Sequence, residues 1–422
     1  MSTEKNKNLM PKRRFPEFRD AASWRPVSLG EISIPVNERV GAKKLTPVSI
    51  SAGIGFVPQA EKFGRDISGN QYQLYTLVKD GDFVYNKGNS LKFPEGCIYL
   101  LQGWGEVAAP NVFICFRLKS DYSNGFFQNC FESNAHGKQL KKHITSGARS
   151  NGLLNISKEA FFGVEIPTPS SNEQQKIADC LSSLDQLISA QARKVEALKT
   201  HKKGLMQQLF PREGEIQPRL RFPEFQDAGD WEETRLRKLG KLVSGLTYSP
   251  DDVRESGLLV LRSSNVQNSE IALDDCVYVD PSIKGANLSQ PEDILICVRN
   301  GSKALIGKCA LIPQGMPLCT HGAFMTVFRA ETPSFVFQLF QSDRYQKQVA
   351  GDLGATINSI NGSQFLKYEF MVPKPVEQKR IADFLVSLDA LITAANQELD
   401  TLKTHKKGLM QQLFPISEAM ES

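Results

Sequence analysis

The stretch HKKGLMQQLFP occupies residues 201–211, and the same eleven letters return at residues 405–415. Chance does not repeat a stretch of that length in a chain of 422 residues, so we infer that one segment was duplicated. The spacing of about two hundred residues leaves room for one globular domain between the copies. The sequence therefore predicts an internal repeat as the basis of the fold.

The duplication extends outward from this stretch. EQQKIADCLSSLDQLI from Glu173 corresponds to EQKRIADFLVSLDALI from Glu377, and RFPEF begins at both Arg14 and Arg221. Each RFPEF is followed by a tryptophan, Trp24 or Trp231. The segments between these ends match poorly, although DGDFVYNKGN resembles PEDILICVRNG and VFICFRLK resembles AFMTVFRA. The ends and a strand skeleton are duplicated, whereas the middles have diverged.

Both closing segments predict one long helix. Apolar residues recur in the first at alternating spacings of four and three, at Ile177, Leu181, Leu184, Ile188, Val195, Leu198, Leu205 and Leu209. The second copy repeats this register from Ile381 to Leu413. A period of 3.5 residues is typical of coiled coils, and prolines flank both segments. Each helix should have roughly 40 residues and a length of about 60 Å.

A single helix of this kind would expose its apolar seam, so it needs a partner of similar length. The other copy is such a partner, and a pseudo-twofold relation between the halves would make the two helices antiparallel. The alternative is that each helix packs only against its own half. Lys202 and Lys406 occupy equivalent seam positions. They would either fix register and orientation or extend to solvent at the rim.

The predicted fold class is α+β: two α/β domains separated by two long helices that form an antiparallel coiled coil, with a pseudo-twofold internal repeat. The expected boundaries are 1–170 for the first domain, 171–211 for the first helix, 212–375 for the second domain, 376–415 for the second helix and 416–422 for a tail.

Composition indicates an ordinary globular protein, with 41% hydrophobic and 23% charged residues. No run of eighteen apolar residues occurs, the N-terminus lacks a signal-peptide core, and the eight cysteines form no CxxC pair. We therefore expect no membrane association, a cytoplasmic location and free thiols. Residues 1–210 hold 28 Lys and Arg against 19 Asp and Glu, whereas residues 211–422 hold 23 against 27. The basic first half is compatible with a polyanionic partner, although charge alone does not decide it.

Motifs for catalysis are missing from the sequence. There is no GxxxxGK[ST] phosphate loop, no GxGxxG after a strand, no HExxH and no Cys/His cluster with metal spacing. Glu377 and Lys379 mimic a nuclease ExK pattern, but the first copy has Gln175 where the lysine would be. The sequence thus favours a binding protein without a cofactor or metal of its own.

Polar and basic loops between apolar strands supply the candidate binding residues. Arg, Lys, Asn and Gln side chains pair with phosphates and with guanine and adenine edges. In the first half these are Lys87, Asn89, Lys92, Lys141, Lys142, Arg149 and Asn151. In the second half they are Arg262, Asn265, Arg299, Asn300 and Lys303.

The paired halves, each closing in EQxxIAxxLxxLDxLI and LKTHKKGLMQQLFP, resemble the specificity subunits of type I restriction–modification enzymes. The resemblance covers essentially the whole chain. It implies two target-recognition domains that each read one half of a gapped, asymmetric site in double-stranded DNA. It also implies that the helices set the gap and dock two methyltransferase subunits, which restriction subunits join. S-adenosylmethionine and ATP with Mg would then be bound by those partners.

Residues that are identical in both helices but lie off the seam are candidates for docking two copies of one partner. The set includes Asp185 and Met206, and the residues expected to carry docking are Lys199, Lys203, Gln207, Lys403, Lys407 and Gln411. A different hypothesis is a non-catalytic coiled-coil scaffold with two modules that assembles proteins without reading DNA.

Overall fold

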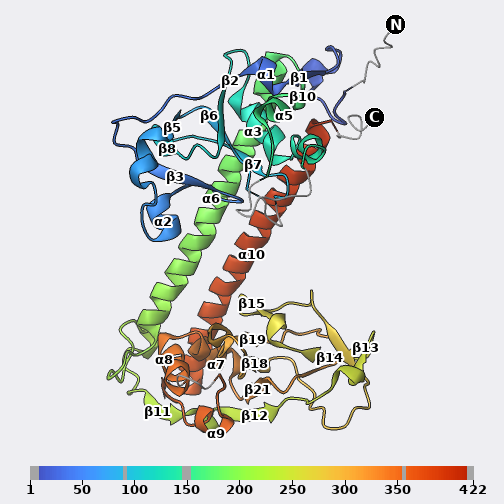
Figure 1. The fold of residues 1–422 in the computed structure, drawn as a ribbon. Helices are drawn as coiled ribbons and strands as arrows, with labels where there is room; N and C mark the ends of the chain where they lie inside the picture. Colours follow the sequence, from blue (N-terminus) through green and yellow to red (C-terminus); the bar gives the residue numbers. More distant parts are fainter. Residues whose placement is uncertain (1–8, 89–92, 145–153, 354–357, 416–422) are drawn as a thin grey trace. The chain divides into compact units, whose positions relative to one another are not determined.

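The computed structural model describes residues 9–88, 93–144, 154–353 and 358–415. The chain divides into two compact units (Figure 1). The first contains residues 1–191 and 398–422, and the second contains residues 192–397. The units therefore do not follow the linear order of the chain, because each takes one part of each long helix. The two long helices are α6 (Ser171–Leu209) and α10 (Pro375–Leu413), each of 39 residues.

The first unit contains two four-stranded sheets, with strand orders β2-β9-β6-β7 and β4-β3-β8-β5, and a β1-β10 ribbon. The strands are β1 (Arg25–Ser28), β2 (Ser33–Pro35), β3 (Thr46–Ser51), β4 (Gly55–Pro58), β5 (Thr76–Lys79), β6 (Asp82–Asn86), β7 (Cys97–Leu100), β8 (Glu106–Ala109), β9 (Ile114–Leu118) and β10 (Glu165–Thr168). Short helices are α1 (Leu29–Ile32), α2 (Gln59–Phe63), α3 (Asn124–Glu132), α4 (Gly137–Lys141) and α5 (Lys158–Phe162).

The second unit repeats this plan, with sheets β12-β21-β18-β19 and β13-β17-β14-β20 and a β11-β22 ribbon. Its strands are β11 (Glu232–Arg235), β12 (Gly240–Ser244), β13 (Val253–Arg254), β14 (Leu258–Leu261), β15 (Val266–Gln267), β16 (Glu270–Ile271), β17 (Val277–Val279), β18 (Ile294–Cys297), β19 (Cys309–Leu311), β20 (Cys319–His321), β21 (Met325–Ala330) and β22 (Glu369–Val372). The helices α7 (Pro333–Phe340), α8 (Asp343–Asp352) and α9 (Gly362–Phe365) precede α10. The predicted fold class is confirmed: two α/β domains and two long helices that pack together.

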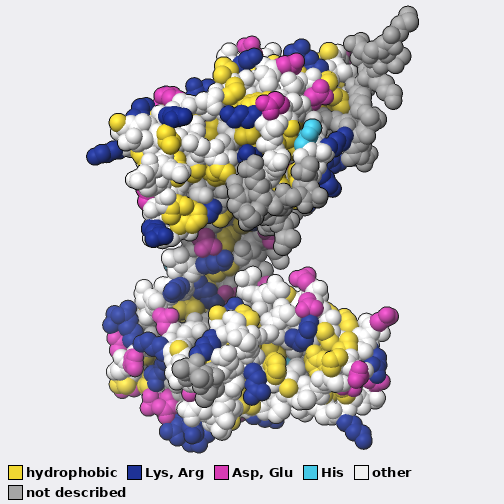
Figure 2. All heavy atoms as spheres, viewed as in Figure 1, with side chains coloured by type: hydrophobic (Ala, Val, Ile, Leu, Met, Phe, Trp, Pro, Cys, Tyr) yellow, Lys and Arg dark blue, Asp and Glu magenta, His cyan; other side chains and the backbone are white. Residues whose placement is uncertain are grey.

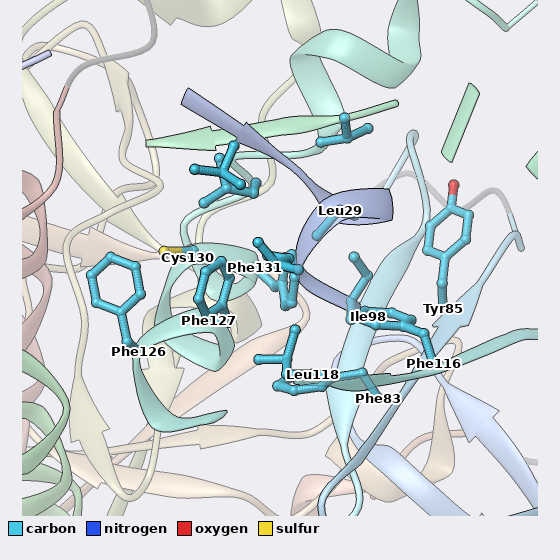
Figure 3. Packing of buried hydrophobic residues seen from close by; sticks show 14 of the residues in the cluster. Leu29, Phe83, Tyr85, Ile98, Phe116, Leu118, Phe126, Phe127, Cys130 and Phe131 are labelled. Carbon is cyan, nitrogen blue, oxygen red and sulfur yellow. The ribbon is translucent and has the colours of Figure 1, made fainter. Parts of the chain in front are cut away.

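Aromatic side chains dominate the core of the first unit (Figure 3). Phe83 of β6 stacks on Phe116 of β9 with ring centroids 5.3 Å apart. Trp24, the tryptophan that follows RFPEF, is buried edge-on between Phe126 of α3 and Phe414. Phe414 belongs to the second copy of the repeated stretch. The end of α10 therefore closes the core of the first half of the chain.

The reciprocal arrangement closes the core of the second unit. Trp231 packs edge-on against Phe210 at a centroid distance of 6.3 Å, and Phe210 contacts Phe335 of α7. Phe210 belongs to the first copy of the repeated stretch. Each aromatic pair contributes about 0.5–1.5 kcal/mol beyond the area that it buries. Both copies are needed because each completes the core of the other half.

Lys202 and Lys406, the two seam lysines, form equivalent ion pairs between the long helices. In the second unit Lys202 contacts Asp389 of α10 at 2.6 Å, and in the first unit Lys406 contacts Asp185 of α6 at 2.7 Å. Late residues of one helix thus meet early residues of the other, so the helices are antiparallel. Burial opposes the charge of Lys406, but hydrogen bonds to Asp185 and to Glu132 raise its pKa.

These contacts decide the alternatives that the sequence left open. The lysines fix register, since both side chains are mostly buried and paired. Each helix also packs against globular cores, because Ile177 and Leu181 join the first core while Met206 and Leu209 join the second. Met206 was expected on an exposed surface, and that expectation is wrong because Met206 is buried. Asp185 is exposed as expected, but its carboxylate pairs with the seam lysine Lys406.

RFPEF attaches the start of each half to its long helix. Arg14 forms a two-pronged ion pair with Glu173 in the first turn of α6, at 2.7 and 2.6 Å, and donates to two backbone carbonyls. Arg221 makes the same contacts with Glu377 of α10, at 2.8 and 2.7 Å. All four side chains are almost fully buried. Glu377, half of the apparent nuclease pattern, therefore serves as an anchor.

Two buried histidines lie in the cores of the units. His136 packs edge-on against Tyr85 and Phe131, and burial lowers its pKa to about 4. His321 at the end of β20 contacts Val243 and Ser289 through its two ring nitrogens, and burial lowers its pKa as well. Both imidazoles are therefore held neutral in the folded protein.

All eight cysteines are free, as the sequence predicted, and six of them are buried. Among the described residues, no helix combines the length and the apolar character that crossing a membrane requires.

Replacing Glu173 by Gln should destabilise the first unit selectively, because the buried Arg14 guanidinium loses its countercharge. We expect a loss of about 3–5 kcal/mol in the free energy of unfolding of that unit. Hydrogen exchange of the full chain should show faster exchange in residues 14–24 and at the start of α6. The matched variant Glu377→Gln should act on residues 221–231 instead. Identical exchange patterns in the two variants would contradict the anchoring role.

Stability should fall on acidification, because the folded-state pKa of both histidines lies below the unfolded value of about 6.5. Their contribution is fully present above that pH and is lost as the pH falls, for His136 over the range down to about 4. His136→Phe should remove on the order of 3 kcal/mol of this pH dependence from the first unit. Denaturant unfolding at pH 7, 6, 5 and 4 measures it, and parallel curves for wild type and variant would refute it.

Candidate nucleic-acid interface

In the second unit, the segments at the ends of β14, β18 and β20 lie next to the segment that precedes α9. The segments are 261–263, 298–303, 321–324 and 358–360. Backbone hydrogen bonds join them: the Gly322 amide donates to the Leu261 carbonyl at 3.0 Å. The amides of Val298 and Arg299 both donate to the Phe324 carbonyl, at 3.0 and 3.1 Å. These loops therefore form one connected surface, which we call the second-unit loop cluster.

Amide side chains connect the same cluster. Asn300 donates from Nδ2 to Ser263 Oγ at 3.0 Å, and Asn358 donates from Nδ2 to the Gly301 carbonyl at 3.3 Å. Such hydrogen bonds hold loops in one conformation and reduce the entropy that would be lost on binding a ligand.

The first unit brings the equivalent segments together. The Leu154 amide donates to the Lys87 carbonyl at 2.9 Å, as the Ile360 amide does to Val298 in the second unit. Asn86 at the end of β6 donates to the Ile50 carbonyl of β3 at 2.8 Å. We call residues 51–54, 87–88 and 154–156 the first-unit loop cluster. Its β3–β4 turn carries Ile54, which is 76% exposed.

An ion pair between a buried aspartate and a partly exposed arginine lies at the start of the strand that leads to each cluster. Arg117 of β9 binds the fully buried Asp82 of β6 at 2.6 and 3.0 Å. Arg329 of β21 binds Asp293 with two bonds of 2.8 Å. Sequence reasoning missed these pairs, although the signal was present: the two duplicated strand patterns each carry the Asp or the Arg.

The structure places the candidate residues of the first half in two places. Lys87 lies in the loop cluster, whereas Lys141 and Lys142 lie at the end of α4 and are exposed. The remaining candidates lie outside the described residues: Asn89, Lys92, Arg149 and Asn151.

The candidates of the second half converge on its loop cluster. Arg299 and Lys303 are exposed, and Asn300 is half-buried through its bond to Ser263. Arg262 is also part of the cluster, and its guanidinium pairs with Asp275 at 2.7 Å.

Asn265 does not belong on the candidate surface. It is buried, its Oδ1 accepts from the Arg262 amide, and its Nδ2 donates to the carbonyls of Ala272 and Asp275. The Asn265 amide forms its hydrogen bonds with backbone groups of its own loop, because a turn leaves such groups without partners in a strand or helix. No donor or acceptor of this side chain faces outward. Sequence reasoning also overlooked Phe324, an exposed aromatic residue in the same cluster.

Basic and acidic side chains alternate over the visible face of both units (Figure 2). On that face they do not gather into one continuous basic patch. On this face, contacts with a polyanion would come from individual basic residues rather than from a uniform positive field.

The residues considered for docking lie on the long helices. Lys199, Lys203, Gln207, Lys403, Lys407 and Gln411 are all exposed. Lys199 and Lys403 each form an ion pair with an acidic residue one turn earlier in the same helix, Glu196 and Asp400 respectively. Exposed pairs of this kind contribute little to stability. No group of three or more metal-ligating side chains occurs within the described part of the chain.

The sequence of this chain matches a known family over residues 67–200 and 228–404, described as the type I restriction modification DNA specificity domain. The two matches cover well over half of the chain, one in each half.

Curated relatives agree with the family match. The chain is 26% identical over 290 residues to the type I restriction enzyme MjaVIII specificity subunit of Methanocaldococcus jannaschii, covering 66% of this chain and 67% of the relative. It is 29% identical over 180 residues to the EcoKI specificity subunit of Escherichia coli, covering 40% of this chain and 38% of the relative. The match thus spans well under half the length of the EcoKI subunit.

Solved structures show the same fold. The crystal structure of the S subunit of a type I restriction–modification system from M. genitalium aligns with a TM-score of 0.60, at 14% identity, over 97% of this chain and 100% of that one. A chain from a structure of type I complex assembly and conformational transition aligns with a TM-score of 0.55, at 18% identity, over 93% and 97%. The two matched segments and the curated relatives together show that this protein belongs to the type I restriction–modification DNA specificity family, as a non-catalytic specificity subunit.

Proposed function

We propose that each unit reads one half of a gapped, asymmetric site in double-stranded DNA through its loop cluster. One observation carries this proposal. The two units place equivalent loops on the same strand frame, yet the side chains on those loops differ. A shared frame with unlike loops is what two readers of unlike half-sites require.

The chemistry of the loops supports DNA as the ligand. Arg299 and Lys303 are exposed in the second-unit cluster, and exposed guanidinium and ammonium groups contact phosphates and guanine edges. In the first unit, Lys141 and Lys142 are suited to phosphate contacts, which strengthen binding without selecting a sequence. The antiparallel helices run through both units and would set the gap between the half-sites.

The docking of enzyme partners is the second part of the proposal. Leu187 and Leu391 occupy equivalent positions on α6 and α10, and their exposed fractions are 55% and 56%. The identical exposed residues Lys199 and Lys403 lie on the same helices. Duplicated apolar and basic side chains suit two copies of one partner. We therefore infer that two methyltransferase subunits dock here, that restriction subunits join them, and that these partners bind S-adenosylmethionine and ATP.

Exchanging residues 25–165 for the corresponding segment of another specificity subunit should change one half of the methylated motif. The other half and the gap should stay unchanged, because the second-unit cluster and the helices are retained. Methylome sequencing of a host that carries the exchanged chain and its partner subunits measures this. A change in both halves would rule out one reader per unit. A mobility shift with duplex DNA separates this function from that of a protein scaffold.

Reversing the charge of Lys199, Lys203, Lys403 and Lys407 to Glu should weaken assembly with methyltransferase subunits and leave the preferred DNA motif unaltered. Lys194→Glu is the matched control, because Lys194 is exposed on the same helix but its counterpart is Glu398. Size-exclusion chromatography with light scattering measures the assembly. Undiminished binding of two methyltransferase chains would remove this surface from the proposal.

A further inference from the structure

Phe324 is an exposed aromatic residue on a rigid turn between β20 and β21. Its side chain is 58% exposed. Its carbonyl accepts two backbone hydrogen bonds, and the Met325 amide closes the turn on the Gly322 carbonyl at 2.8 Å. Exposing a phenylalanine forgoes the favourable free energy of burying its ring.

Single exposed apolar residues are common, and exposure alone does not mark a site. Two observations distinguish Phe324. It is the one aromatic residue among the large exposed apolar side chains that the structure describes in the second unit. It also lies in the loop cluster, whereas Leu318, which is 61% exposed, precedes β20 at the opposite end of the same strand.

Arg299 is held beside the ring of Phe324. Its guanidinium carbon lies 5.8 Å from the ring centroid, in a cation–π contact. Its backbone is fixed on both sides, by the bond to the Phe324 carbonyl and by a bridge to Ser359. The guanidinium is exposed, so its hydrogen-bond donors remain accessible next to an apolar surface.

We propose that Arg299 and Phe324 read one base step of the second half-site together. The Arg299 guanidinium donates to O6 and N7 of a guanine in the major groove. The Phe324 ring contacts the 5-methyl group of a thymine in the neighbouring base pair and orients the guanidinium. These are the pairings that the geometry of the groove favours for an arginine and for an apolar ring. The inference rests on the proposed reading of DNA by the second unit.

The test uses the full chain assembled with its methyltransferase subunits, and a duplex that carries the sequence motif that this complex methylates. Each guanine of the second half-site is replaced in turn by 7-deazaguanine, which lacks the N7 acceptor. Each thymine is replaced in turn by deoxyuridine, which lacks the methyl group. We expect the wild-type affinity to fall about five- to 150-fold at one guanine and roughly fourfold at one adjacent thymine.

Variants assign these losses to side chains. Phe324→Ala should bind the thymine and deoxyuridine duplexes equally, and Arg299→Ala should bind the guanine and 7-deazaguanine duplexes equally. Leu318→Ala is the matched control and should keep both wild-type ratios. Because Phe324 is exposed, its truncation should leave folding intact, and the probes also test the wild-type chain without any substitution.

Three results would overturn the inference: a second half-site without guanine next to thymine, wild-type sensitivities at non-adjacent positions, or a Phe324→Ala variant with the wild-type deoxyuridine ratio. Each of these leaves half-site reading intact. A wild-type complex that does not distinguish its motif from random duplex would instead refute the proposed function itself.

Discussion

Each long helix must bury its last turn in the core of the other half of the chain, and the rest of the structure depends on this constraint. Phe414 packs against Trp24 in the first unit, and Phe210 packs against Trp231 in the second. Neither half is complete without the final helical turn of the other. The eleven repeated residues therefore include the part that closes each core.

Polar contacts fix the relative direction and the register of the two long helices. The pairs Lys202–Asp389 and Lys406–Asp185 satisfy two mostly buried lysines only when the helices are antiparallel and in one register. A shift by one residue would leave an ammonium group in a partly buried seam without its carboxylate, which is costly. The ion pairs of Arg14 and Arg221 then fix the start of each half to the first turn of a helix. Rigid helices with fixed ends are a suitable frame for loops that must be placed accurately.

The loops show how one frame serves two specificities. Two Asp–Arg pairs with buried aspartates, Asp82 with Arg117 and Asp293 with Arg329, hold equivalent strands in equivalent places. The side chains of the loops beyond those strands do not have to pack in the same way in both units. Ile54 is exposed in one cluster and Phe324 in the other. Divergence is thus tolerated in the part of each unit that faces outward.

The sequence by itself determined the repeat, the α+β class and the two long helices with one register, because a period of 3.5 and identical letters are local signals. Only the tertiary structure decided which half each helix end completes, since Phe414 and Trp24 are far apart in the chain and their contact follows from core packing. It also separated Asn265, whose polar atoms are used inside its loop, from Arg299, which is exposed. Polar residues in loops look alike in a sequence. Their roles differ because burial and hydrogen-bond partners are set by segments that fold back from elsewhere.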